Sequence, residues 1–421
     1  MRIGGTVLRA GAVAAGLAAA MPAVAQDRPG PFTFRLDLRA EVADNRSLAA
    51  VSPGTTTSGE ARLGFGFRRE TGIETLTLDA SAVVRAISGP GAASVPGGFQ
   101  DQRLRATYAR TAARSSLNLS ASYSQADIAT LRDLTEFVDP DTGEIVLPPD
   151  FEGLTGTGIR RVTSASGRLR LGEGTPLTTT LSAGISDTRY ENASPALVDA
   201  LRTNAGASAR LQLTPVLAAT AGVRWTRFDP AVGAARETTG VDVALSQEFP
   251  RGTATLAFAA DMLPEGTRLG VTLGRTFDLP AGSLALSVGA TQPAGSSTIG
   301  LTGALRYTQD LAGGGSLSAT ASRSVGAGVD DTQRIVTLLA LAYGQDVGPN
   351  GRLGLNASHA ISSVVTTGTE TTTTTLGASY SHALTADWTM TVGVNHRIRT
   401  ATGAAEAQGS TIFLSLGRLW P

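Results

Sequence analysis

The feature of this sequence that most restricts its fold is an alternation of apolar and small polar residues with a period of two. Residues 376–381 read Leu-Gly-Ala-Ser-Tyr-Ser, and residues 389–395 read Thr-Met-Thr-Val-Gly-Val-Asn, on either side of a short turn at 385–387. Successive side chains of a strand point to opposite faces, so this stretch predicts a β-hairpin with one apolar and one polar face. The same alternation recurs from Phe32 to Trp420, and the sequence therefore predicts an all-β chain.

Composition narrows the class of protein further. The 421 residues include 50 glycines and only 17% charged residues, which is unusual for a soluble α/β enzyme of this size. No window beyond the first 25 residues holds 18 consecutive apolar residues, which excludes helical membrane spans. Cysteine is absent, so disulfides and thiol catalysis are excluded. The formal net charge of zero gives no electrostatic reason to expect nucleic acid as a partner.

The N-terminus has the pattern of a secretory signal peptide. Arg2 and Arg9 provide positive charge, residues 10–20 form a short apolar run, and Ala23-Val24-Ala25 fits the small-x-small cleavage rule. The apolar run is too short to span a bilayer. We expect residues 1–25 to be removed, which leaves 26–421 as a single domain.

Connections of two kinds alternate along the chain. Short turns, such as those at Pro215, Pro250 and Pro280, alternate with mostly longer and looser loops, of which 126–158 is the longest. Outer-membrane barrels have short periplasmic turns and longer outer loops, and a sheet in lipid has to close on itself. The sequence predicts a transmembrane up-and-down antiparallel β-barrel of about 20 strands (18–22) with aromatic residues beside the short turns.

The last strand carries a resemblance to a known class of protein. Ile412, Leu414 and Leu416 alternate toward the near-terminal aromatic Trp420, although Arg418 stands where an outward apolar residue is usual. This segment resembles the C-terminal assembly signal of bacterial outer-membrane β-barrel proteins. The pattern of the chain as a whole is similar to that of porin-like members of this class. The resemblance implies the cell outer membrane as the location. It also implies outer-membrane lipid, the barrel-assembly machinery and periplasmic chaperones as partners, and leaves association of barrels open.

Charged residues are expected on the inner face, because a charge facing lipid near the midplane costs about 2–4 kcal/mol. Arginines and carboxylates are interspersed there. These residues either create an electrostatic field in the pore that favours anions, or they form a self-neutralising ladder of arginine–carboxylate pairs that holds the wall together. The pore-lining candidates are Arg35, Arg39, Arg62, Arg103, Arg105, Arg168, Arg170, Arg210, Arg224 and Arg306.

The loop 126–158 has two interpretations. Folded inward it narrows the channel, and folded outward it presents a surface site. Asp139, Asp141 and Glu144 have the oxygen chemistry that calcium prefers, but the run is too short for an EF-hand loop and Asp-Thr-Gly is a common turn. We therefore predict no metal site and no cofactor.

Catalysis has little support in the pattern. The only histidines are His359, His382 and His396, and the alternation places all three on the outward side. We expect no enzyme. The predicted role is a porin-like channel for passive diffusion of small hydrophilic solutes. The alternative is a non-conducting barrel for surface-polysaccharide export or envelope structure. A secreted Thr/Gly-rich β-solenoid would lack the aromatics beside the short turns and the terminal barrel strand.

Overall fold

A computed structural model describes residues 31–420 apart from 47, 91–97, 129–153, 155–157, 195–196, 296–298, 328–332 and 366. The predicted signal peptide lies outside the described residues, as does most of the loop 126–158. Both therefore stay predictions.

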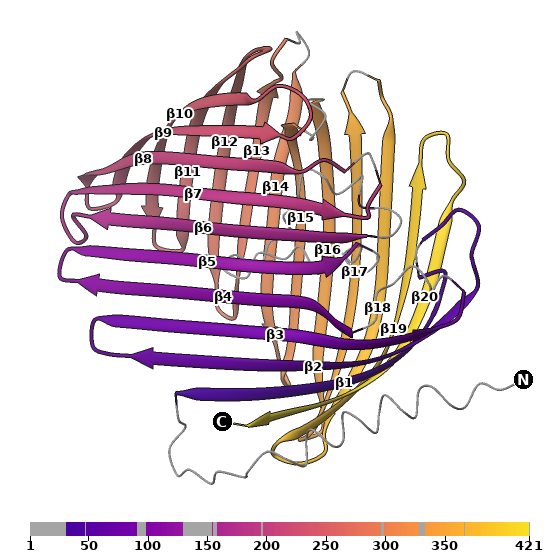
Figure 1. Ribbon diagram of the computed structural model, residues 1–421. Helices are drawn as coiled ribbons and strands as arrows, with labels where there is room; N and C mark the ends of the chain where they lie inside the picture. The colour runs from indigo at the N-terminus through magenta and orange to yellow at the C-terminus, as the bar shows by residue number, and fades with distance from the viewer. Residues whose placement is uncertain are drawn as a thin grey trace, which may run out of the picture.

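The described residues form twenty antiparallel β-strands in one sheet. Each strand pairs with its neighbours in sequence, and β20 pairs with β1, so the sheet is closed (Figure 1). The predicted fold class and strand number are confirmed. No helix among the described residues is long and apolar enough to cross a membrane. The strands are β1 (Phe32–Asp44), β2 (Thr55–Glu70), β3 (Glu74–Ser88), β4 (Gly98–Ala112), β5 (Ser115–Asp127), β6 (Ile159–Leu171), β7 (Leu177–Glu191), β8 (Ala200–Thr214), β9 (Leu217–Pro230), β10 (Arg236–Phe249), β11 (Gly252–Leu263), β12 (Gly266–Leu279), β13 (Gly282–Gln292), β14 (Gly300–Leu311), β15 (Gly315–Ala327), β16 (Gln333–Val347), β17 (Gly351–Val364), β18 (Glu370–Ala383), β19 (Trp388–Ala401) and β20 (Ala407–Trp420).

The seam between β1 and β20 closes the barrel. Its register runs from Phe34 opposite Trp420 to Ala43 opposite Thr411. In Figure 1 the indigo strand β1 lies beside the yellow strand β20. Closure leaves no edge strand with unpaired backbone groups, which is the condition for a sheet to exist in hydrocarbon.

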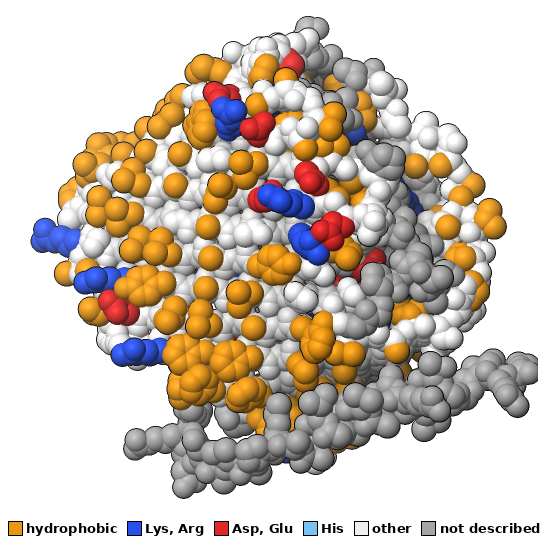
Figure 2. Space-filling view, in the orientation of Figure 1, with side chains coloured by type: hydrophobic (Ala, Val, Ile, Leu, Met, Phe, Trp, Pro, Cys, Tyr) orange, Lys and Arg blue, Asp and Glu red, His pale blue; other side chains and the backbone are white. Residues whose placement is uncertain are grey.

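The two faces of the sheet differ as the alternation predicts. Large apolar side chains such as Leu273, Val288 and Leu301 are 56%, 61% and 70% exposed on the outer face. The opposite face is concave, because side chains two strands apart meet there: Arg224 on β9 forms an ion pair with Asp261 on β11. Figure 2 shows hydrophobic side chains spread over the exterior of β1 to β10, with charged groups gathered toward the strand ends.

Short turns join the strands at one end of the barrel, here called the turn end; the other end is the loop end. Glycine is needed where a turn closes tightly: Gly252 has φ 112°, and a Cβ there would lie 1.9 Å from the carbonyl oxygen of Thr276. Exterior aromatic residues lie next to these turns, at Tyr307 before the turn to β15 and at Trp388 where β19 begins. The chain therefore has the predicted aromatic belt at its turn end.

Two exterior arginines lie within this belt. The Arg275 guanidinium is 4.2 Å from the ring centre of Phe249 and 5.1 Å from that of Phe277. Arg418 lies 4.6 Å from the Trp420 ring and 5.4 Å from the Trp388 ring. Cation–π contact at an interface explains why an arginine occupies the position near the C-terminus where an apolar residue is usual.

Candidate functional site

The register places the ten candidate arginines on the concave face. That they line a conducting pore stays a prediction. They come from seven strands: Arg35 and Arg39 from β1, Arg62 from β2, Arg103 and Arg105 from β4, Arg168 and Arg170 from β6, Arg210 from β8, Arg224 from β9 and Arg306 from β14.

The most buried charges lie toward the loop end of β2 to β4. The Arg85 side chain is 2% exposed and donates from Nε to Glu60 Oε1 (2.6 Å) and from Nη2 to Asp101. Asp101 has φ 47° and lies where the β3–β4 register shifts, so a β-bulge places its carboxylate beside Arg85. A buried charge needs such partners, since losing one leaves the other unpaired. Asp101 could not be placed from the sequence, because the extra residue of the bulge in β4 breaks the period of two there. Arg85 keeps the inward parity of β3 but was not among the predicted pore-lining residues.

Part of the first loop turns into the barrel. Asn45, at φ 49°, is 3% exposed and donates from its side chain to the carbonyl oxygens of Ala49 (2.8 Å) and Gln408 (2.9 Å). Leu48 is 7% exposed and approaches Gly409, whose position faces the lumen. The described part of loop 45–54 therefore lies against the inner wall beside β20.

Arg46 fastens this loop to the wall. Its Nη1 lies 3.0 Å from Ser58 Oγ and 3.5 Å from Glu41, and its Nη2 lies 3.6 Å from Glu60. The side chain is 11% exposed. Arg46 is an inward charge that the sequence does not predict, because it lies in a loop, where alternation does not indicate the direction of a side chain.

A second cluster of charges spans β9 to β12 and is balanced. Arg224 contacts Asp242 (3.1 Å) and Asp261, and Arg268 contacts Asp261 at 2.7 Å. Two arginines thus meet two carboxylates. At this position the geometry favours the self-neutralising ladder of ion pairs that holds the wall together, rather than a pore field that favours anions.

A third group of charges, at the turn half of β6 and β8, is less balanced. Arg170 lies 3.7 Å from Glu173 and Arg210 lies 4.0 Å from Glu248, while their side chains are 50% and 44% exposed. Arg168 has Asn118 and Ser182 as its neutral cross-strand neighbours. Three arginines thus meet two carboxylates, which leaves one excess positive charge here. This part of the inner wall is therefore cationic.

Hydroxyl groups line much of the remaining inner wall. Ser120 and Ser166 lie 2.8 Å apart across β5 and β6, as do Ser122 and Ser164. Small polar side chains leave space in the lumen and offer donors and acceptors to a hydrated solute.

Only the ends of the loop 126–158 belong to the described residues. Ile128 (0% exposed), Leu154 (3%) and Leu197 (8%) form an apolar cluster with Tyr190 and Ala193 at the loop end. The direction of the loop stays open, and Asp139, Asp141 and Glu144 lie outside the described residues. Within the described part of the chain, no three His, Asp or Glu side chains gather as metal ligands do.

The three histidines lie on the exterior, as expected. Each has a neighbouring hydroxyl: His359 Nδ1 is 2.9 Å from Thr374, His396 Nδ1 is 2.9 Å from Ser410, and His382 Nδ1 is 3.3 Å from Tyr380. None faces a lumenal carboxylate among the described residues. That the chain is not an enzyme remains an expectation.

Comparisons with known proteins identify the architecture. No family model and no curated protein sequence matches the chain. Among solved structures, a mutant ferric enterobactin receptor PfeA from Pseudomonas aeruginosa aligns with a TM-score of 0.51 and 10% identity, over 93% of this chain and 81% of that one. The siderophore receptor PirA from Acinetobacter baumannii aligns with a TM-score of 0.53 and 8% identity, over 94% and 81%.

A structure of OpdK from Pseudomonas aeruginosa with vanillate covers 92% of this chain and 99% of its own, at 13% identity. Its TM-score of 0.43 is too low to bear on this chain. The two receptors share the barrel fold with this chain, and at these identities the likeness extends to the fold alone.

Proposed function

We propose that this chain is an outer-membrane channel for the passive diffusion of small hydrophilic solutes. The observation that carries the proposal is a closed sheet whose exterior is apolar and whose interior is lined by hydroxyls and arginines. An exterior on which leucines are up to 70% exposed is far more apolar than a soluble surface tolerates, and lipid is its natural solvent. The signal peptide 1–25 would deliver the chain to the envelope.

The C-terminal strand supports delivery to the outer membrane. Ile412 and Leu414 are 62% and 49% exposed on the exterior of β20, and Leu416 and Trp420 lie on the same face. We propose that this face is what the barrel-assembly machinery recognises before β20 pairs with β1.

Within this function, the cationic wall at Arg168, Arg170 and Arg210 favours anions. Exposed guanidinium groups facing the lumen raise the local concentration of anions and lower that of cations. The balanced cluster around Arg224 and Asp261 adds little, and we expect these three residues to make a large contribution to the preference.

Planar-bilayer recordings test both parts of the proposal. We expect discrete current steps from the wild-type protein, and a reversal potential in a salt gradient that has the sign of anion preference. Arg168→Gln/Arg170→Gln/Arg210→Gln should move the reversal potential toward zero, whereas the charge-conserving lysine triple variant should not. Cation preference would refute the role of the arginines. A silent bilayer would refute the channel and favour a non-conducting barrel for surface-polysaccharide export or envelope structure.

A further inference from the structure

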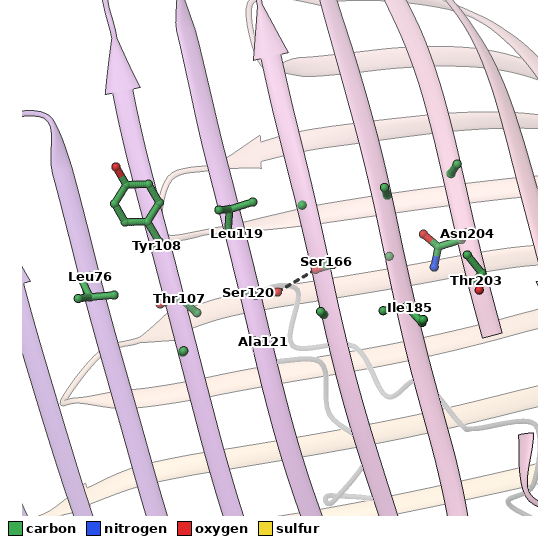
Figure 3. Close-up of a pocket in the computed structure, with 16 residues that line it drawn as sticks. Leu76, Thr107, Tyr108, Leu119, Ser120, Ala121, Ser166, Ile185, Thr203 and Asn204 are labelled. Carbon is green, nitrogen blue, oxygen red and sulfur yellow. Dashed lines mark hydrogen bonds between the residues drawn. The ribbon is translucent and has the colours of Figure 1, made fainter. Parts of the chain in front are cut away.

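The exterior of the barrel is hollowed over β4 to β8. A shallow, open depression of about 630 Å³ lies there between Leu76, Tyr108 and Leu119 on β3 to β5 and Ile185 on β7 (Figure 3). Its lining is almost wholly apolar. A hollow of this size lies within the range of small-ligand sites, about 300–1,000 Å³.

Small residues in register form the floor of this hollow, here called the trench. Ala106, Ala121 and Ala165 are direct cross-strand neighbours on β4, β5 and β6. The next row toward the turn end continues as Gly167, Ala183 and Ala205. Because direct neighbours on one face touch, two rows of small residues leave a continuous channel across the strands.

Large side chains bound the trench. Tyr108 and Leu119 are opposite each other at the start of the row that continues as Gly167, Ala183 and Ala205, and Ile185 is opposite Ala165. The floor therefore passes diagonally from one row to the next between these walls. A slender apolar chain fits such a shape, whereas the convex wall of a second barrel does not enter it.

Two exterior arginines face each other on the loop side of the trench. Arg161 on β6 and Arg189 on β7 are direct cross-strand neighbours. Like charges in this arrangement destabilise a sheet unless anions lie beside them, and Glu191 and Asp187 each contact one of the two arginines. Arg161 lies four residues along β6 from Ala165 in the trench, and Arg189 lies four residues along β7 from Ile185, which bounds it. Four residues span about 13 Å at 3.3 Å per residue.

Both guanidinium groups keep donors accessible. Arg161 donates from Nε to Gln125 Oε1 (3.0 Å) and from Nη1 to Glu191, and its side chain is 37% exposed. Arg189 donates from Nε to Asp187 Oδ2 (2.9 Å), and its side chain is 68% exposed. The carboxylates hold the two guanidinium planes, and the exposed Nη groups remain accessible to a further acceptor.

We propose that this surface binds an anionic membrane lipid with a terminal phosphate, with that phosphate at Arg161 and Arg189 and one acyl chain in the trench. Guanidinium forks match phosphate oxygens in geometry and charge. The 13 Å separation suits a lipid whose headgroup lies at the membrane surface and whose chain reaches inward. The inference rests on the proposed membrane location, because only there does the trench meet acyl chains.

Trp225 provides a local reporter. It lies directly opposite Ala205, which lines the trench, while Trp388 and Trp420 lie in the belt at the turn end. Trp388→Phe/Trp420→Phe leaves Trp225 as the single fluorophore, and Trp225→Phe/Trp420→Phe leaves Trp388 as a remote control. Vesicles of unlabelled phosphatidylcholine carry a small fraction of chain-brominated phosphatidic acid, or of chain-brominated phosphatidylcholine, and quenching is measured for each.

We expect brominated phosphatidic acid to quench Trp225 at a mole fraction about tenfold lower than brominated phosphatidylcholine, which is the preference that one charge-assisted hydrogen bond provides. Trp388 should show no such preference. Arg161→Gln/Arg189→Gln should abolish the preference at Trp225, and Ala121→Leu/Ala165→Leu should reduce quenching by both lipids. Arg227→Gln, which removes an exterior arginine that already contacts both Asp229 and Glu237, is the matched control and should change nothing.

Each other outcome overturns the inference in a different way. If brominated phosphatidic acid is preferred over brominated phosphatidylcholine to the same extent at Trp225 and Trp388, the trench selects no lipid. A preference that survives the double arginine variant would remove the phosphate contact. Protection of Trp225 from both lipids, with Trp388 quenched, would mean that a second copy covers the trench. If neither tryptophan is quenched, the membrane location itself fails.

Discussion

Glycines on the concave face let polar side chains from strands two apart meet over the strand between them. Gly240 on β10 lies between Arg224 and Asp261, and a Cβ there would lie 2.6 Å from Arg224 Nε and 2.5 Å from Asp261 Oδ1. Gly344 leaves the same kind of passage for the 3.0 Å hydrogen bond from Arg352 to Ser316. The high glycine content thus has a structural purpose beyond the turns.

Replacing Gly240 with valine should break the bridge beneath it. The added side chain would displace Arg224 from Asp261, and such overpacking typically lowers the free energy of unfolding by about 1–3 kcal/mol. Urea unfolding of the purified barrel, followed by tryptophan fluorescence, measures the change.

Gly326→Val is the matched control. Gly326 also faces inward, on β15, and a Cβ there would meet no atom within 4 Å, so β-propensity should make this variant neutral or slightly stabilising. Equal loss of stability in both variants would contradict the bridging role of Gly240.

At the residue scale, the face of each strand residue could be read from the sequence because the period of two survives along nearly every strand. The prediction of side-chain direction failed where the backbone departs from that period. The bulge at Asp101 and the left-handed Asn45 each put a polar group into the buried network without any signal from alternation. The exterior arginines Arg161 and Arg189 were missed for another reason: their strands continue past the apolar band, where charge no longer meets hydrocarbon.

At the scale of elements, the loop 45–54 acts as an extension of the inner wall. Its attachment depends on Arg46, which contacts Glu41, Glu60 and Ser58 with only 11% of its side chain exposed. Hydrogen bonds that join buried charged groups stabilise more than exposed ones, since removing one partner leaves the other unpaired.

Arg46→Gln should therefore release the loop. We expect the free energy of unfolding to fall by about 1–3 kcal/mol, and cleavage within 45–54 by an added protease to become faster. Limited proteolysis followed by mass spectrometry locates the cleavage, and urea unfolding measures the stability.

Arg35→Gln serves as the comparison, because it removes a lumenal arginine whose ion pair with Asp37 is made by a side chain that is 66% exposed. Exposed pairs of this kind contribute about 0–1 kcal/mol. Loop cleavage that is as fast in Arg35→Gln as in Arg46→Gln would show that Arg46 does not fasten the loop.

At the scale of the whole molecule, closure follows from strand number and alternation, but the seam does not. The sequences of β1 and β20 do not predict that these two strands pair, because their alternation resembles that of every other strand. The register from Phe34 opposite Trp420 to Ala43 opposite Thr411 is set by the tilt and stagger of the complete barrel. The seam register depends on all twenty strands, so the sequences of two strands alone do not predict it.

A disulfide across the seam tests closure and register together. The chain has no cysteine, so Leu38→Cys/Leu416→Cys introduces a single pair at directly opposed exterior positions. Opposed residues of antiparallel strands have Cα atoms about 4.5–5.5 Å apart, within the range that a disulfide spans. Mild oxidation should cross-link nearly all molecules, and the heat-denatured product should migrate differently from the reduced linear chain on a non-reducing gel.

Leu38→Cys/Leu414→Cys shifts the pairing by two residues, to a diagonal separation of about 7–8 Å, and should cross-link poorly. Efficient cross-linking of the shifted pair alone would place the seam in another register, and failure of both pairs would mean that β1 and β20 do not close the sheet.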